Sequence, residues 1–409
     1  MTVTFEDIKR AQEELQGIIV RTPLVPSAVF SEKTGADVFL KLEIFQATGS
    51  FKDRGAYTKM KTLTHEELKR GVISMSAGNH AQSVAYHAKA LGTQATIVMP
   101  VNTPVTKIMN TEKWGARVIL EGTLLSESYD AAQKIAHENG YTFIHPYDDP
   151  DIIRGQGTIG LEIFEDCPEI DAVIIPIGGG GLSSGISLAL KTLNPKIKVY
   201  GVEAEGYASL YSALHEDEAH LNYGKNLTLA EGIAVKTIGK NCFEILKDTL
   251  DDIFVIDEFH IEEAVDLMVR KQHIVAEGAG AIALAALLTH PKRFEGKKVV
   301  LLICGANIDP RVLGTIILRG QIRDGKLARL RIKTPDMPGV LATITNILAT
   351  HRCNILETHH QRLFYTVPIK MADVDITIET RNERHVEEVM TDIKAAGFEV
   401  HRLHDNREG

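Results

Sequence analysis

Short apolar segments alternate with amphipathic ones through most of the chain. The apolar segments are rich in β-branched residues and poor in charge, which predicts strands buried on both faces of a sheet. They occupy residues 38–42, 72–75, 96–99, 117–120, 141–144, 172–175, 199–202, 253–256 and 299–303. Helical spacing between them predicts helices over residues 79–91, 104–113 and 126–138. Strands that alternate with helices predict an α/β fold of doubly wound, mostly parallel sheets.

The pattern changes near residue 326. It then predicts, in order, a strand, a helix, two strands, a helix and a last strand, which is the ferredoxin-like order. These elements lie at residues 327–332, from the turn at 336–339 to about 349, around 355, and at 373–378, 384–396 and 398–403. Residues 323–325 are the expected linker. The sequence therefore predicts a domain over residues 1–325 and a second over residues 327–409.

Composition and charge narrow the function classes. The 409 residues are 44% hydrophobic with a formal net charge of -9. The sequence shows no basic patch with interleaved aromatic residues, so we expect no nucleic-acid surface. No apolar run approaches the length of a membrane span, and residues 1–7 lack the pattern of a secretory signal. Cys167, Cys242, Cys304 and Cys353 have no metal-type spacing. We expect free thiols, no bound metal and a cytoplasmic location.

The stretch Thr48–Gly55 carries the first candidate for chemistry. Ser50 is a good N-cap residue, so we expect a helix to begin there and to hold Lys52 in its first turn. The positive end of the helix dipole and any burial favour the neutral amine of Lys52, which is the nucleophilic form. Taken alone, a lysine at this position is better explained as a solvated surface residue, and the other motifs of the chain change that balance.

A run of four glycines, Gly178–Gly181, follows a buried strand and precedes a helix. Residues without a Cβ let backbone N–H groups converge on an anion at a helix start, and a phosphate fits such a site. One alternative is a dinucleotide site, with Glu203 placed for a ribose, but Ser183 or Ser184 stands where the last glycine of G-x-G-x-x-G should be. The other alternative is a tight turn, which does not call for four glycines.

Five short motifs occur in one order along the first four-fifths of the chain: Ser50–Lys52, Ser76–His80, Gly178–Leu182, Glu277–Gly280 and Cys304–Asn307. Together they resemble the pyridoxal-phosphate enzymes of the tryptophan-synthase-β type, and more closely the threonine dehydratases (threonine ammonia-lyases). The resemblance implies fold type II, with a small subdomain of about residues 50–145 inserted into a larger one.

The resemblance also implies roles for these residues. Lys52 would hold pyridoxal phosphate covalently and act as the catalytic base. The cofactor phosphate would lie in the glycine loop, a hydrogen bond from Asn79 would reach its phenolic oxygen, and Cys304 would face its pyridine nitrogen. The implied cofactor-binding residues are Lys52, Phe51, Asn79, Gly178, Gly179, Gly180, Gly181, Leu182 and Cys304. The implied substrate-binding residues are Ser76, Ala77, Gly78, Asn79 and His80, with Ser76 also counted as catalytic.

The implied reaction is the dehydration and deamination of L-threonine to 2-oxobutyrate and ammonia, with L-serine as a second substrate. Related serine racemases carry a hydroxyl residue where this chain has Ala77, which favours dehydration over racemisation. They also bind a cation near Glu203 and Glu205, but Ser209 stands in place of a further carboxylate, so we expect no divalent metal, and a monovalent cation remains open. Within the family, a serine racemase and a serine or 3-hydroxyaspartate dehydratase remain open. Outside it, a nicotinamide-dependent dehydrogenase and a non-catalytic amino-acid sensor remain open.

The C-terminal pattern resembles an ACT domain, a module that binds amino acids as effectors. The ligand of such modules usually lies at the first strand-to-helix turn, here near Asp336 and Gly339. The expected partners are therefore an amino-acid substrate, an amino-acid or nucleotide effector, and further copies of the chain in a homodimer or homotetramer. The alternative is a folded tail that only holds subunits together.

Overall fold

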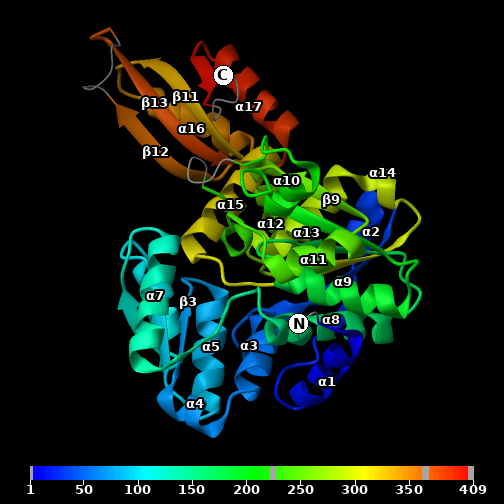
Figure 1. Ribbon diagram of the computed structural model, residues 1–409. Coiled ribbons are helices and arrows are strands. Elements are labelled where there is room, and N and C mark those ends of the chain that lie inside the picture. Colours follow the sequence, from blue (N-terminus) through cyan, green and yellow to red (C-terminus); the bar gives the residue numbers. More distant parts are fainter. Residues whose placement is uncertain (1–2, 222–226, 362–367, 404–409) are drawn as a thin grey trace. The chain divides into compact units, whose positions relative to one another are not determined.

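A computed structural model describes residues 3–221, 227–361 and 368–403 (Figure 1). The described chain forms two compact units, Met1–Asp309 and Pro310–Gly409. The first unit ends before the boundary that the sequence pattern places at residue 325, because helix α15 (Pro310–Arg323) packs with the strands that follow it. The functional boundary at 325 stays a prediction.

The larger sheet of the first unit has the strand order β1-β2-β10-β7-β8-β9. Only the edge strand β1 runs antiparallel to its neighbour among the described strands of this sheet, and the other pairs are parallel. Apolar residues fill both faces of these strands, as their sequences predict. The strands are β1 (Leu24–Pro26), β2 (Asp37–Leu42), β7 (Ala172–Pro176), β8 (Lys198–Ala204), β9 (Asp252–Ile256) and β10 (Lys298–Ile303).

The smaller sheet has the order β5-β4-β3-β6 and is parallel throughout its described strands. Its strands are β3 (Val72–Met75), β4 (Ala95–Met99), β5 (Arg117–Leu120) and β6 (Thr142–Phe143). Val72 and Ile97 pack with helix α5 (Asn79–Ala90), whereas Ile73 and Val98 pack with α7 (Leu125–Asn139) on the other face. The sheet lies between β2 and β7 in the sequence, and the predicted doubly wound fold is confirmed.

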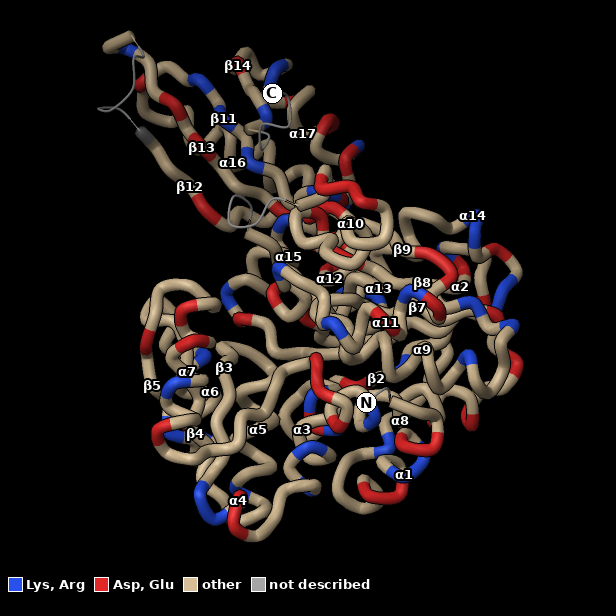
Figure 2. Tube along the Cα trace, viewed as in Figure 1, with Lys and Arg blue, Asp and Glu red and all other residues tan. Residues whose placement is uncertain are grey.

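Helices surround both sheets of the first unit (Figure 1). Charged residues gather on outer helices such as α1 and α4 (Figure 2). Besides α5 and α7, the helices are α1 (Phe5–Leu15), α2 (Ala28–Thr34), α3 (Lys52–Lys61), α4 (His65–Arg70), α6 (Val105–Glu112), α8 (Pro150–Asp166), α9 (Gly181–Leu193), α10 (Ser209–His215), α11 (Lys240–Thr249), α12 (Glu258–Gln272), α13 (Gly278–Thr289) and α14 (Pro291–Phe294), with short 3₁₀ turns η1 (Glu43–Phe45) and η2 (Glu231–Ile233).

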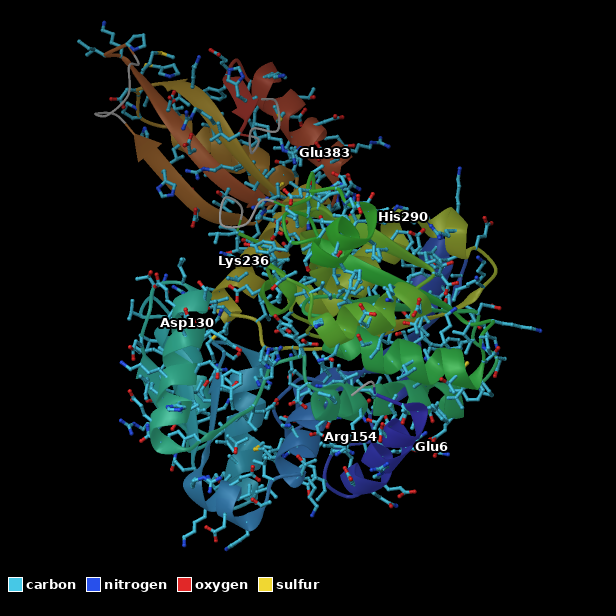
Figure 3. All side chains as sticks on the ribbon, in the orientation of Figure 1. Glu6, Asp130, Arg154, Lys236, His290 and Glu383 are labelled. Atoms are coloured by element: carbon cyan, nitrogen blue, oxygen red, sulfur yellow. The ribbon has the colours of Figure 1, made fainter. Side chains whose placement is uncertain are left out.

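Local chemistry explains where several helices begin and what they pack against. Thr4 and Asp7 form a capping box at the start of α1, and Asp149 caps α8 with Pro150 in its first turn. Arg154 on α8 lies near α1 (Figure 3). It donates to the Glu14 carboxylate on α1 at 2.7 Å and so joins the two helices. Helix α13 is apolar on all sides, which suits its buried position against the larger sheet.

The second unit has an antiparallel sheet with the order β12-β13-β11-β14. After α15 its elements are β11 (Leu327–Pro335), α16 (Val340–Thr350), β12 (Ile355–Gln361), β13 (Met371–Glu379), α17 (Glu383–Ala395) and β14 (Glu399–Arg402). Alternate residues such as Leu330, Ile332 and Ile376 form a core with the two helices α16 and α17. The predicted ferredoxin-like order is confirmed. In the ranges that the structure describes, no helix is long and apolar enough to span a bilayer.

Candidate active site

The loop before helix α3 differs from its predicted form. Phe51, not Ser50, precedes the helix, and Lys52 is its first residue. Ser50 instead pairs with Gly305 in a short antiparallel bridge, and its buried hydroxyl has no hydrogen-bond partner among the described residues. The Phe51 N–H donates to the Cys304 carbonyl at 3.0 Å. Pairing with the distant Cys304 loop holds Ser50 outside the helix, so the predicted N-cap was wrong.

The Lys52 amine lies in a partly buried position beneath the loop after strand β6. Its Nζ donates to the Pro146 carbonyl at 2.6 Å and lies 5.1 Å from the centre of the Phe51 ring. Burial lowers the pKa of Lys52 to about 8, and this outweighs the smaller, opposite influence of the nearby Cys304, Cys242 and Glu277 side chains. An appreciable fraction of the amine is therefore neutral and nucleophilic near physiological pH.

A buried ion network anchors helix α3 two residues beyond Lys52. The Arg54 guanidinium donates to both Glu43 oxygens at 2.7 and 2.8 Å and to both Glu162 oxygens at 2.6 and 2.9 Å. Lys41 also donates to Glu162, at 2.6 Å. Two cations and two carboxylates balance in charge, so the network tolerates its full burial and joins α3 to β2, η1 and α8.

The glycine loop connects β7 to helix α9 and packs closely against Tyr147. A Cβ on Gly179 would lie 2.2 Å from Cγ of the Tyr147 ring, and a Cβ on Gly181 would lie 2.5 Å from the Tyr147 carbonyl oxygen. Gly180 has a φ of 94°, which other residues rarely adopt. No described side chain caps α9, so its first N–H groups face the loop without such a partner. The loop has the form of an anion cradle at a helix start.

Asn79, the first residue of α5, contacts two residues from far along the chain. Its Nδ2 donates to Glu277 Oε1 at 2.7 Å, and its Oδ1 accepts from Asn307 Nδ2 at 2.8 Å. Burial raises the pKa of the Glu277 carboxyl to about 7. These contacts bring the Asn79 and Cys304 motifs to one place, beside the loop that carries Lys52.

Cys304 follows β10 at the carboxyl edge of the larger sheet, where ligands of such sheets bind. Its thiol is buried and donates to the Ala279 carbonyl, with sulfur and oxygen 3.4 Å apart. Burial raises the pKa of the Cys304 thiol well above its ordinary value, so the group is neutral. A neutral thiol is a weak donor and not an ion-pair partner.

The Ser76–His80 turn follows β3 at the edge of the smaller sheet. The Ser76 hydroxyl accepts from the Gly78 N–H at 3.2 Å. His80 is buried, and its Nε2 lies 3.1 Å from the Ile144 carbonyl, to which a protonated Nε2 donates. Burial lowers the pKa of His80 to about 3, so its ring is neutral. His80 thus contacts the segment that follows β6, while Ala77 contributes no hydroxyl.

The structure gives Glu203 a partner other than the ribose or the cation that the sequence suggested. Its carboxylate accepts from the backbone N–H groups of Leu210 and Tyr211 at 2.8 and 2.9 Å, at the start of α10. Burial raises the pKa of Glu203 to about 7. Its hydrogen bonds serve the α10 backbone, which removes the support that Glu203 gave to a dinucleotide site.

Three residues of the site had no role in the sequence analysis: Pro146, Tyr147 and Asn307. Pro146 and Tyr147 lie a few residues after strand β6 of the smaller sheet, as Ser76 follows strand β3. Because parallel strands end at one edge of a sheet, this placement is a signal that could have found them. Asn307 ended a recognised motif, but its contacts with Thr48 and Asn79 cannot be read from that motif.

A lysine of lowered pKa beside a glycine cradle, between two parallel sheets, defines an α/β enzyme that binds a phosphorylated aldehyde such as pyridoxal phosphate. The family described as pyridoxal-phosphate dependent enzyme matches residues 15–305, and the ACT domain family matches residues 327–397. This chain therefore belongs to the pyridoxal-phosphate dependent enzyme family and carries a C-terminal ACT domain.

Among curated relatives, an L-threonine ammonia-lyase from Thermotoga maritima is 45% identical over 398 residues, which cover 97% of this chain and 99% of that protein. One from Geobacter sulfurreducens is 38% identical over 96% of this chain and 98% of that protein. Among solved structures, threonine deaminase isoform 2 from Solanum lycopersicum has a TM-score of 0.72 and 34% identity, covering 76% of this chain and 92% of that one. Maize serine racemase has a TM-score of 0.73 and 31% identity, covering 79% and 99%. The predicted family, fold class and cofactor are confirmed.

Proposed function

We propose that this protein is an L-threonine ammonia-lyase that forms 2-oxobutyrate and ammonia, and that it also converts L-serine to pyruvate and ammonia. The observation that carries the proposal is the likeness to an L-threonine ammonia-lyase over 97% of the chain. The contacts of Lys52, the glycine loop and Asn79 support it, because they place a nucleophilic amine, an anion cradle and a hydrogen-bond donor around one site.

Pyridoxal phosphate, when bound, withdraws electrons from Cα of the substrate and makes its proton acidic. The amine of Lys52 is the group that removes this proton. With a pKa of about 8, the amine has a neutral fraction at physiological pH and still accepts a proton readily. The Pro146 carbonyl accepts one N–H of the amine and so restrains its direction.

The N-termini of helices α9 and α5 each bind one anionic group. The N–H groups of Gly178–Leu182 at the start of α9 hold the cofactor phosphate. The N–H groups and hydroxyl of Ser76–Asn79 at the start of α5 hold the substrate carboxylate. Each anion would then lie at the positive end of a helix dipole, which is the favourable end.

Cys304 favours elimination over transamination. Its neutral thiol cannot hold a proton on the pyridine nitrogen of the cofactor as a carboxylate would. Without a proton on that nitrogen the bound cofactor would be a weaker electron sink, which would favour departure of the β-hydroxyl with a proton, as water, over the proton transfers of transamination. The released enamine takes up water and loses ammonia to give the 2-oxo acid.

A serine racemase is the second candidate, because solved racemases share this fold at 31 and 34% identity. Ala77 favours the lyase, since it offers no hydroxyl to carry a proton to the second face of Cα. Steady-state kinetics with L-threonine, L-serine and 3-hydroxyaspartate, together with a chiral assay for D-serine, separate the candidates. D-serine formation faster than pyruvate formation would contradict the proposal.

Lys52→Ala tests the central role directly. We expect 2-oxobutyrate formation to fall by at least about 10³-fold, because both the covalent anchor and the base are removed. Lys61→Ala, on the exposed end of the same helix, is the matched control and should keep near-normal activity. A Lys52→Ala enzyme with activity close to that of the control would disprove the assignment.

We also infer control by the ACT domain. Gly339 precedes α16 with a φ of 92°, and the effector, an amino acid or a nucleotide, would bind at this turn near Asp336. Full-length Asp336→Ala, with exposed Glu387→Ala on α17 as control, should lose its response to isoleucine, valine or AMP while keeping its basal rate. An unchanged response would place the effector elsewhere.

The assembly and location follow as further proposals. We infer a homodimer or homotetramer, which sedimentation equilibrium tests, because small regulatory domains of this kind commonly pair. We infer a cytoplasmic location from the four free cysteines, since such thiols suit a reducing compartment. Fractionation of cells with an antibody against the protein tests this inference.

A further inference from the structure

A relay of hydrogen bonds runs from the lysine loop to Asn79. Asn307 Nδ2 donates to the backbone carbonyl of Thr48 at 2.8 Å and to Asn79 Oδ1 at 2.8 Å. Asn79 Nδ2 then donates to Glu277 Oε1 at 2.7 Å. The relay thus joins the loop that carries Lys52, the segment after β10, the start of α5 and the start of α13.

The relay leaves the Asn79 amide only one satisfactory orientation. A carboxamide can be turned by 180°, which exchanges its donor and its acceptor. The Thr48 carbonyl can only accept, so Asn307 must turn its nitrogen toward Thr48 and, with the second hydrogen, toward Asn79. Asn79 must then present oxygen to Asn307 and nitrogen to Glu277, whose carboxylate accepts.

Two glycines make room for this arrangement. A Cβ on Gly305 would lie 2.3 Å from Glu277 Oε1 and 3.0 Å from Asn79 Nδ2. Gly49 has a φ of 77°, and a Cβ there would lie 3.1 Å from Asn307 Oδ1. Any larger residue at Gly305 would displace the Glu277 carboxylate from Asn79, so the relay depends on the backbone at this position.

We propose that Asn307 is a positioning residue that sets the direction of the Asn79 amide, so that Asn79 offers an N–H and not a carbonyl to pyridoxal phosphate. An amide nitrogen has two hydrogens, and Glu277 accepts one of them. The other is left for the phenolic oxygen of the cofactor, which accepts. This inference rests on the proposed function and on the contact with the phenolic oxygen that the family resemblance implies for Asn79.

A double-mutant cycle tests the proposal on the full-length protein. Asn307→Asp keeps the shape but replaces the donor with an acceptor, which would turn the Asn79 amide over. The dissociation constant of pyridoxal phosphate is measured by fluorescence titration of the cofactor-free protein, and the visible absorption band of the bound cofactor is recorded. We expect Asn307→Asp to raise the dissociation constant by about 10-fold or more, since hydrogen bonds to charged groups contribute this much.

The effect should depend on Asn79. In an Asn79→Ala background, Asn307→Asp should change the dissociation constant by less than about 2-fold, because residues that act through one another are not additive. Asn307→Ala, which removes the donor without adding charge, goes through the same cycle and guards against misfolding of the aspartate variant. Asn110→Asp, on the exposed side of α6, has the same change of charge and should bind the cofactor normally.

The outcomes separate the two assignments. If Asn307→Asp changes the dissociation constant of pyridoxal phosphate by the same factor in the unmodified protein and in Asn79→Ala, the positioning role of Asn307 is overturned. Asn79 would then remain a cofactor contact. An Asn79→Ala variant with the affinity and absorption band of the unmodified protein would overturn the cofactor contact itself, and the positioning role with it. A shifted absorption band in Asn307→Asp that vanishes in the Asn79→Ala background supports the relay.

Discussion

Gly179→Ala should weaken binding of pyridoxal phosphate through a steric conflict that the structure defines. The new Cβ would lie 2.2, 2.3 and 2.4 Å from three carbons of the Tyr147 ring, whereas ordinary contacts between such atoms are 3.4–4 Å. The ring cannot retreat easily, because it also packs edge-on against His145 with ring centres 4.8 Å apart. The glycine loop must therefore move.

The size of the effect follows from the cost of overpacking. Inserting a methyl group into a well-packed site costs about 1–3 kcal/mol, which corresponds to a rise of about 5- to 150-fold in a dissociation constant. Because the loop holds the cofactor phosphate in the proposed function, we expect the loss to appear in the affinity for pyridoxal phosphate. Fluorescence titration of the cofactor-free protein measures that affinity.

Two variants show whether the conflict is the cause. Tyr147→Ala removes the ring, so adding Gly179→Ala to it should change the affinity by less than about 3-fold, as expected when one interaction accounts for both effects. Gly314→Ala is the control, because among the described residues no heavy atom beyond its own helix backbone and chain neighbours lies within 4 Å of the added Cβ, and the residue is inside helix α15. It should leave affinity unchanged. Unchanged affinity in Gly179→Ala, or an equal loss in the Tyr147→Ala background, would refute the reasoning.

Three further predictions concern buried charges. Acylation of Lys52 in the cofactor-free protein, followed by peptide mass spectrometry, should rise with a midpoint near pH 8; a midpoint near the ordinary lysine value of 10.5 would contradict its lowered pKa. Burial raises the pKa of Glu203 from 4.5 to about 7, so the folded state holds its proton longer and the free energy of unfolding falls as pH rises between these values. Urea unfolding should therefore show that the free energy of unfolding of Glu203→Gln, relative to that of the unmodified protein, rises by up to about 3 kcal/mol between pH 4.5 and pH 8. An identical pH dependence of the two free energies would exclude the effect. Arg54→Leu leaves two buried carboxylates with one cation and should destabilise the fold by about 3–5 kcal/mol in the same assay, whereas a loss below about 1 kcal/mol would show that the network relaxes.

The amino-acid sequence by itself determined the layers of the fold. Apolar segments such as residues 172–175 and 299–303 are buried on both faces of a parallel sheet, because a segment without a polar side leaves no face for water. The change of period near residue 326 likewise predicted the ferredoxin-like order. Both signals are local, and each element could be read from its own residues. The order of the five motifs indicated the family in the same way.

Only the tertiary structure decided how the site is held together. Ser50 has the chemistry of an N-cap, yet its pairing with Gly305 keeps it out of helix α3. Asn79 and Glu277 are 198 residues apart, and Thr48 and Asn307 are 259 apart. The orientation of an amide and the pKa of a buried amine depend on such distant partners and on exclusion of water, and neither exists until the chain has folded.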